Sequence, residues 1–168
     1  MLFRFFLTTD DLLRALRRED IDGASFLPPS LVRDAERTRS IRVERLHLPQ
    51  YFAVFFHQAK SVPLSDPAVR RALTAAVDRD ALIREALFDE GTRAEAPIPE
   101  GALGYAPDLA FIPFDPERAK QNLEEAGWTD PNGNGVREKD GVPLRFSLAT
   151  TDWPEYVATA NLLAAQWR

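Results

Sequence analysis

The segment of residues 63–79, PLSDPAVRRALTAAVDR, carries the clearest structural signals in the chain. Ser65 or Asp66 is a good helix N-cap, because its side-chain oxygen can accept a hydrogen bond from a free N–H of the first turn. Pro67 suits the first helical position, where a missing N–H has no cost. Apolar side chains then recur at the spacing of one helical face: Val69, Leu73, Ala76 and Val77. The segment therefore predicts a helix that packs against a core.

A second helix is expected directly after this one. The polar sequence Asp78-Arg79-Asp80 predicts a kink, and Asp80 is expected to restart the helix. Gly91 is expected to close it, because glycine readily adopts the backbone conformation that ends helices. The two helices should therefore form a kinked pair.

Two more helices are expected toward the C-terminus. Asp115 is a good N-cap, Pro116 suits the first turn, and Gly127 suits the end of the third helix. Pro154 begins a fourth, with Val157, Ala160, Ala164 and Trp167 on one face. The sequence ends within this helix without a C-cap signal, so we expect the chain to be cut from a longer protein.

Strand signals alternate with these helices. Apolar, aromatic and β-branched residues predict strands at residues 2–7, 41–46, 50–56 and 144–148. Thr9 or Asp10 should cap a short helix after the first strand, and another short helix is expected near residues 31–37. The mixture of strands and helices predicts an α/β fold.

Composition and charge exclude several function classes. The 168 residues contain 45% hydrophobic and 28% charged side chains, which is typical of a globular protein. The formal net charge is −5, so the chain lacks the basic excess that binding to nucleic acid requires. There is no cysteine, which excludes disulfides, thiolate nucleophiles and cysteine-ligated metals. The apolar stretches are too short to span a membrane.

Aromatic residues are the best candidates for ligand contacts. Residues 92–114 form a long loop rich in proline and glycine, and Tyr105 lies within it together with Phe111 and Phe114. Trp153 and Tyr156 follow a predicted strand at the start of a helix. Ligand crevices in α/β folds open at the carboxyl ends of strands, so these two residues are the stronger candidates.

A turn at residues 130–141 resembles a calcium-binding loop at its start. Asp130, Asn132 and Asn134 occupy the first, third and fifth positions, but the twelfth position holds Gly141 in place of the usual Glu. We favour an Asn/Gly-rich turn, with calcium binding as the alternative. The two histidines, His47 and His57, lack a metal-binding spacing, and no catalytic motif is present, so we expect no enzyme and no cofactor.

The chain resembles the bacterial extracellular solute-binding proteins of family 5, the oligopeptide-, dipeptide- and nickel-type binding proteins of ABC importers. The segment of residues 63–79 resembles the signature of that family. Residues 114–128, FDPERAKQNLEEAGW, and the turn of residues 130–144 match two further blocks in the expected order. Residues 15–24 resemble a weaker upstream element.

This resemblance implies a fragment of a two-lobe periplasmic-binding-protein fold of type II-like architecture, with a mixed sheet flanked by helices. Residues 1–56 would be the terminal part of the first lobe. Residues 57–168 would be the start of the second lobe, truncated within a helix. His57 stands where the family usually has Asn after an aromatic strand, and it is a candidate ligand contact. The motif residues Asp66, Arg70, Asp78, Arg79, Asp115 and Trp128 are expected to be structural.

The implied function is the capture of peptides or a similar small solute outside the cytoplasmic membrane, followed by delivery to an ABC permease. The expected location is periplasmic or extracellular, with a lipid anchor in the parent protein and a signal peptide that is not in this chain. The alternatives are the ligand-sensing domain of a transcription regulator and a calcium-binding interaction module; a hydrolase is least favoured. Exposed lobe edges suggest a homodimer of the fragment.

Overall fold

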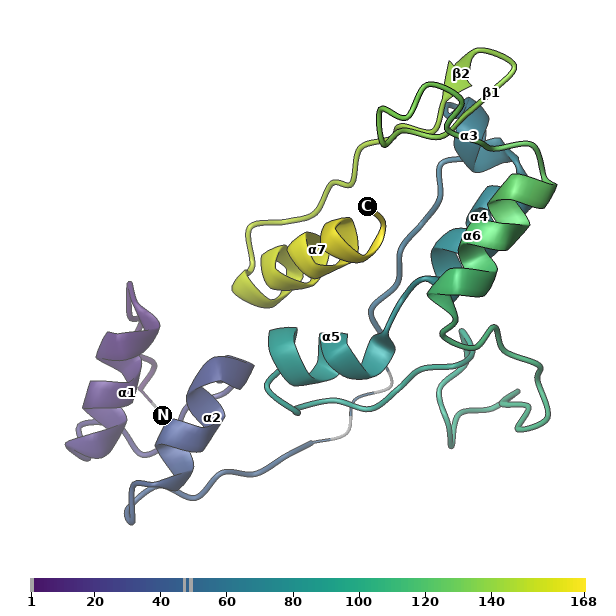
Figure 1. Ribbon diagram of the computed structural model, residues 1–168. Coiled ribbons are helices and arrows are strands. Elements are labelled where there is room, and N and C mark those ends of the chain that lie inside the picture. Colours follow the sequence, from purple (N-terminus) through teal and green to yellow (C-terminus); the bar gives the residue numbers. More distant parts are fainter. Residues whose placement is uncertain (1, 47, 49) are drawn as a thin grey trace.

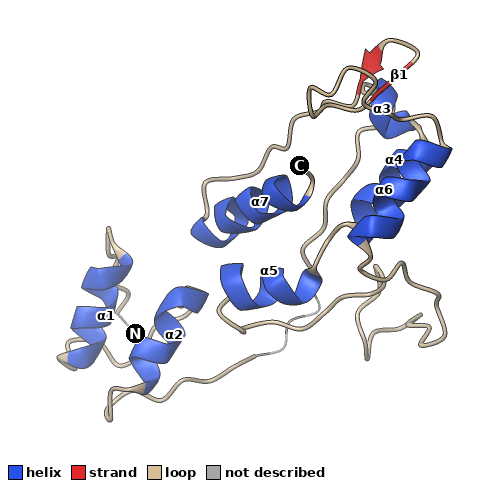
Figure 2. Ribbon diagram, viewed as in Figure 1, coloured by secondary structure: helices blue, strands red, loops and turns tan. Residues whose placement is uncertain are grey.

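The computed structural model describes residues 2–46, 48 and 50–168. It is mainly helical, as Figure 2 shows. In chain order the elements are α1 (Thr9–Arg17), α2 (Pro29–Glu36), α3 (Val62–Ser65), α4 (Pro67–Ala75), α5 (Arg79–Ala86), α6 (Pro116–Glu125), β1 (Glu138–Lys139), β2 (Val142–Pro143) and α7 (Pro154–Gln166).

The helices form three groups in space. In Figure 1, α4 and α6 lie side by side, α5 lies next to α7, and α1 and α2 are set apart near the N-terminus. The small hairpin of β1 and β2 lies beside α3. Elements distant in sequence, α4 with α6 and α5 with α7, therefore build the helical body.

Small residues bring α4 and α6 together. Ala72 and Ala75 of α4 and Ala119 of α6 are buried in one cluster. The short side chains allow the two helix backbones to approach closely. The backbone N–H of Asp115 also donates to the carbonyl of Ala75 at 2.8 Å, which fixes the start of α6 against the end of α4.

A second cluster forms the centre of the core. Leu64, Val69, Leu73 and Trp128 are buried together, and Val69 has no exposed surface. Partly buried apolar residues pack around them: Phe56, Leu123, Ala126, Leu144, Phe146 and Trp167. The core thus joins the family-like segment of residues 63–79 to the C-terminal third of the chain.

The structure confirms the predicted starts of α4, α6 and α7, whereas Thr8, and not Thr9 or Asp10, caps α1. Asp66 caps α4 by accepting a hydrogen bond from the N–H of Ala68 at 2.8 Å. Asp115 caps α6 by accepting from the N–H of Arg118 at 2.8 Å. The predicted boundaries of the helix between them were wrong: Asp78 caps α5, one residue before Arg79, and the helix ends at Ala86, before Gly91. Asp78 replaces Asp80 as the cap because its carboxylate reaches the N–H of Ala81 at 2.9 Å.

The strand predictions at residues 2–7, 41–46, 50–56 and 144–148 were wrong for the described residues. The sheet that the described residues form lies outside these four segments. It has two short antiparallel strands, β1 and β2, which pair Glu138 with Pro143 and Lys139 with Val142. A strand requires a neighbouring strand to satisfy its N–H and C=O groups, and the described residues supply none for those four segments. The mixed sheet that the resemblance implied is therefore not formed within them. His47 lies outside the described residues.

Candidate functional site

The three family-like blocks meet at the carboxylate of Asp66. Its Oδ2 accepts a hydrogen bond from the indole Nε1 of Trp128 at 3.0 Å and lies 3.3 Å from Nζ of Lys139. The ammonium of Lys139 also lies 6.0 Å from the centre of the Trp128 ring. We name Asp66, Trp128 and Lys139 the motif joint, because each comes from a different block.

The end of α6 explains why Trp128 reaches the joint. Gly127 has a φ of +86°, a left-handed conformation that glycine adopts without strain. The N–H of Trp128 then donates to the carbonyl of Leu123 at 2.8 Å, and the N–H of Gly127 donates to that of Glu124 at 2.9 Å. This is the Schellman pattern of a helix end, and it turns the indole back toward the core.

The motif joint favours an ionised carboxylate. The hydrogen bond from Trp128 is the main cause that lowers the pKa of Asp66 below its ordinary value, with smaller contributions from the N–H of Ala68 and from Lys139. Partial burial opposes this shift. The joint therefore stabilises the fold.

The other motif residues also make contacts within the scaffold. Arg70 donates from Nη1 to the carbonyls of Leu64 and Ser65, both at 2.9 Å, and so closes the short helix α3. Asp78 caps α5 as described above. Arg79 has one buried guanidinium nitrogen, Nη1, that finds no hydrogen-bond partner among the described residues.

Helix α7 is held firmly at its C-terminal end. The indole Nε1 of Trp167 donates to the carbonyl of Leu73 at 2.9 Å, and Oε1 of Gln166 accepts from the N–H of Asp78 at 3.1 Å. Leu163 is the buried residue of the helix. The predicted apolar face was wrong at Val157, which is exposed, because packing against α5 and the core buries Leu163 instead.

The start of α7 presents aromatic side chains to solvent. The ring of Tyr156 lies edge-on to that of Phe52, with centroids 4.9 Å apart, and Trp153 lies 6.4 Å from Tyr156. All three remain substantially exposed, at 52% for Phe52, 57% for Trp153 and 37% for Tyr156. We name these residues the aromatic set. The anchored C-terminal end of α7 holds the set in place, so it is a preformed surface for apolar contacts.

The structure thus brings together two of the four predicted ligand contacts. Trp153 and Tyr156 are neighbours, whereas His57 is an exposed residue whose carbonyl accepts from the N–H of Lys60 in a turn. Tyr105 lies in the loop of residues 92–114, which Figure 1 shows beyond the N-terminal end of α6 and away from α7. Among the described residues, no pairing of aromatic rings joins Tyr105 to the aromatic set.

Sequence reasoning did not identify Phe52 as a member of this set. Its only signal is the aromatic character of residues 50–56, which predicts a strand. The partner of Phe52 is far along the chain on α7, so the pairing depends on the tertiary structure.

The calcium-like turn uses its oxygens for its own backbone. The carboxylate of Asp130 accepts from the N–H groups of Asn134 and Gly135, and the side-chain oxygen of Asn132 also accepts from Asn134. The side-chain oxygen of Asn134 accepts from Val136. Within the described part of the chain, no group of three or more His, Cys, Asp or Glu side chains is placed to hold a metal ion. These contacts match an Asn/Gly-rich turn and give no support to a calcium-binding module.

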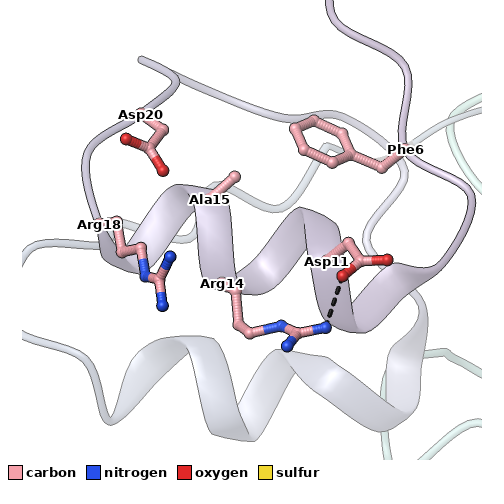
Figure 3. Close-up of a pocket in the computed structure, with 6 residues that line it drawn as sticks. All are labelled: Phe6, Asp11, Arg14, Ala15, Arg18 and Asp20. Carbon is pink, nitrogen blue, oxygen red and sulfur yellow. Dashed lines mark hydrogen bonds and ion pairs between the residues drawn. The ribbon is translucent and has the colours of Figure 1, made fainter.

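Figure 3 shows a shallow hollow on α1, far in sequence from the aromatic set. It has a volume of about 270 Å³ and is lined by Phe6, Asp11, Arg14, Ala15, Arg18 and Asp20. Arg14 forms an ion pair with Asp11, so two of the charges that line the hollow already satisfy each other. None of the predicted ligand contacts lines this hollow.

Known proteins with similar sequences include solute-binding proteins. Protein XP55 of Streptomyces lividans is 38% identical over 148 residues, covering 87% of this chain and 27% of its own length. The oligopeptide-binding protein AppA of Bacillus subtilis is 31% identical over 126 residues, covering 74% of this chain and 23% of its own length. The nickel-binding periplasmic protein of Escherichia coli is 43% identical over 91 residues, which is 52% of this chain and 17% of that protein.

Solved structures show the same relationship. The oligopeptide-binding protein of an ABC transporter from Thermotoga maritima superposes with a TM-score of 0.77 at 25% identity, covering 96% of this chain and 32% of its own. AppA from Bacillus subtilis, solved in complex with a nonapeptide, gives a TM-score of 0.61 at 28% identity, covering 80% of this chain and 27% of its own. The chain therefore has part of the α/β fold of two-lobe periplasmic binding proteins, and it spans less than a third of the length of these relatives.

The relatives are binding proteins rather than enzymes, and members of the family are periplasmic or extracellular. They bind peptides or small solutes for an ABC permease, which gives no support to a sensory domain of a transcription regulator. Among the described residues, none of the helices combines the length and apolar character needed to cross a membrane. Residues 1–168 match the family described as bacterial extracellular solute-binding proteins, family 5 middle, and the chain belongs to that family.

Proposed function

We propose that this protein is the substrate-binding component of an ABC importer, which captures peptides or a similar small solute and delivers it to the permease. The observation that carries the proposal within the structure is the aromatic set of Phe52, Trp153 and Tyr156. The three exposed rings, two at the start of the anchored helix α7 and one from the segment beside it, give apolar contact area that does not require a particular solute side chain. Such a surface suits a solute whose side chains vary.

The rest of the site is proposed on the family relationship. His57 and Tyr105 are exposed and accessible to a solute, and they remain candidate contacts outside the aromatic set. We also propose that the protein acts outside the cytoplasmic membrane as a lipid-anchored or free binding protein. It would need no enzymatic activity and no cofactor for this role, and a homodimer of the chain remains a prediction.

We also keep the lobe assignment as a proposal, with residues 1–56 in the first lobe and residues 57–168 in the second. The two core clusters are built from residue 56 onward, which supports a second unit with its own core. Phe52 and Phe56 contact α7, so the end of the first segment runs along the second unit.

The proposal is tested by identifying the solute and then measuring its affinity. Small molecules that copurify with the protein are released by denaturation and identified by mass spectrometry. Isothermal titration calorimetry then measures the Kd of trialanine and of a nonapeptide for the wild type. We expect peptides in the released fraction and a measurable Kd for at least one of the two probes. If the wild-type protein neither releases nor binds peptide but binds a nickel chelate, the nickel chelate takes the place of the peptide as the proposed solute.

Two matched variants locate the site. Trp153→Ala removes a ring from the aromatic set, and we expect the Kd to increase about tenfold, as for an aromatic residue at the centre of an interface. Phe55→Ala removes a ring from the same segment as Phe52, but Phe55 is 89% exposed and has no ring partner in the set, so its Kd should equal that of the wild type. If both variants increase the Kd equally, or if neither increases it, the solute binds elsewhere.

A further inference from the structure

The turn after α5 has an unusual backbone. Phe88 has a φ of +53° and Asp89 a φ of +67°, so two successive residues with side chains adopt the left-handed conformation. Glycine is the usual residue at such positions, and a bulky residue there is strained. Hydrogen bonds from the N–H of Asp89 to Ile83 at 3.0 Å and from that of Glu90 to Leu87 at 2.8 Å hold the turn. Backbone strain of this kind persists where the surrounding contacts require it.

This turn directs two carboxylates toward the N-terminal segment. Asp89 accepts a hydrogen bond from Nη2 of Arg33, on α2, at 2.6 Å. Both carboxylate oxygens of Glu90 accept from Arg45, Oε2 from Nε at 2.7 Å and Oε1 from Nη2 at 2.6 Å. The pairing of Arg45 with Glu90 is bidentate, the geometry in which a guanidinium and a carboxylate interact most strongly.

Arg45 connects three parts of the chain. Besides Glu90, its Nη1 lies 2.8 Å from Oε1 of Glu36 at the end of α2. The hydrogen bond from Arg45 is the main cause that lowers the pKa of Glu90, and the charge of Arg33 adds to it. The side chain of Glu90 is 21% exposed, so this pair is better shielded from solvent than the other ion pairs of the turn.

The junction between the N-terminal segment and the helical body is polar. Among the described residues, the ion pairs that join residues 2–46 to residues 50–168 are Arg33 with Asp89 and Arg45 with Glu90. Both core clusters are built from residues 56–167 and include nothing from the N-terminal segment. Units joined by a polar contact surface can move relative to each other unless specific contacts hold them.

We propose that the Arg45–Glu90 and Arg33–Asp89 pairs form an electrostatic clasp that sets the orientation of the segment carrying α1 and α2 relative to the helical body. The strained turn at Phe88 and Asp89 presents both carboxylates to the two arginines. Release of the clasp frees the segment to move relative to the helical body. In a two-lobe binding protein, this release would shift the balance between open and closed forms; that consequence alone rests on the proposed function.

The clasp is tested by a distance measurement that needs no solute. The chain has no cysteine, so spin labels can be attached at Ser30→Cys on α2 and Arg71→Cys on α4, both exposed positions. Double electron–electron resonance then gives the distribution of distances between the labels. We expect a mainly narrow distribution, with a minor broad component, for the otherwise unchanged protein in low salt. Glu90→Gln should increase the ratio of broad to narrow populations about fivefold.

Three further measurements separate the clasp from a general effect of charge. Arg45→Gln should broaden the distribution as Glu90→Gln does, because either change removes the bidentate pair. Arg42→Gln neutralises a nearby arginine whose partner, Glu44, lies two residues away, and it should leave the distribution unchanged. Salt at 1 M should broaden the wild type and have little effect on Glu90→Gln. Identical distributions for the wild type and Glu90→Gln, or broadening by Arg42→Gln to the same extent, would overturn the clasp.

The result also separates the clasp from the proposed function. If the protein binds no peptide but its distance distribution broadens in Glu90→Gln, the clasp is supported and the peptide assignment fails. If the protein binds peptide but Glu90→Gln leaves the distance distribution unchanged, the binding function is supported and the clasp fails.

Discussion

The indole Nε1 of Trp128 donates a hydrogen bond of 3.0 Å to Oδ2 of Asp66, and this bond joins the end of α6 to the start of α4. Asp66 at the same time caps α4 through the N–H of Ala68. One carboxylate therefore begins a helix and receives the end of another. This double role explains why two blocks well separated in the sequence act as one structural unit.

The Trp128–Asp66 bond contributes to stability. In Trp128→Phe the ring stays in the core while the N–H donor is lost, so the free energy of unfolding should fall by about 1–2 kcal/mol. Urea denaturation followed by circular dichroism measures this change. Trp153→Phe is the matched control, because Trp153 is exposed at 57%, and it should change stability by less than about 0.5 kcal/mol. A smaller loss for Trp128→Phe than for Trp153→Phe would contradict the role of the bond.

The contribution of Asp66 depends on pH. Its pKa in the folded state is lowered, so the charged form is favoured by folding and stabilises the protein above the ordinary aspartate pKa of about 3.9. This contribution is lost as the pH falls below that value and through the lowered pKa. Asp66→Asn retains an N-cap oxygen but loses the charge facing Lys139. We expect it to be less stable than the wild type at pH 7 and to approach the wild type near pH 2, as measured by urea denaturation; a constant difference at all pH values would argue against the ionised carboxylate.

The N-cap of α6 is a separate source of stability. Asp115→Ala removes the acceptor for the N–H of Arg118 and should cost about 1 kcal/mol, measured by thermal and urea denaturation. Asp108→Ala changes the same residue type in the exposed loop of residues 92–114 and should be close to neutral. Equal effects of the two variants would mean that charge, and not the cap, governs the result.

The end of α6 depends on a glycine. Gly127 has a φ of +86°, and an added Cβ would meet the side chain of Lys139 at ordinary contact distance, 3.7 Å, so backbone strain is the main penalty. Gly127→Ala should therefore lower stability by about 1 kcal/mol and displace the Trp128 indole, which its fluorescence reports. Gly23→Ala is the control: Gly23 has no positive φ and nothing within 4 Å of an added Cβ, and its variant should be neutral or slightly stabilised.

Local signals in the sequence were sufficient for much of the helical structure. The caps Asp66 and Asp115 and the glycine at position 127 act within a few residues, so the starts of α4 and α6 and the end of α6 could be predicted. The strands could not, because a strand depends on hydrogen bonds to a partner. Residues 2–7 and 50–56 have strand-like composition, but the described residues supply no partner for them.

The candidate site divides in the same way. Trp153 and Tyr156 lie three positions apart at a predicted helix start, so the sequence alone identified them as a pair. Their contact with Phe52, and the anchoring of α7 by Trp167 on the carbonyl of Leu73, join residues far apart in the chain. The clasp between Arg45 and Glu90 is of the same kind.

The sequence by itself determined the caps of α4 and α6, the turn of residues 130–141 and the family, because each depends on residues that are neighbours along the chain. Only the tertiary structure decided that the three blocks meet at Asp66, that the aromatic set forms around Tyr156, and that a polar clasp joins the N-terminal segment to the helical body. The physical reason is that capping and turn energies act over one or two turns of the backbone, whereas burial and ion pairing depend on which distant segments the fold brings into contact.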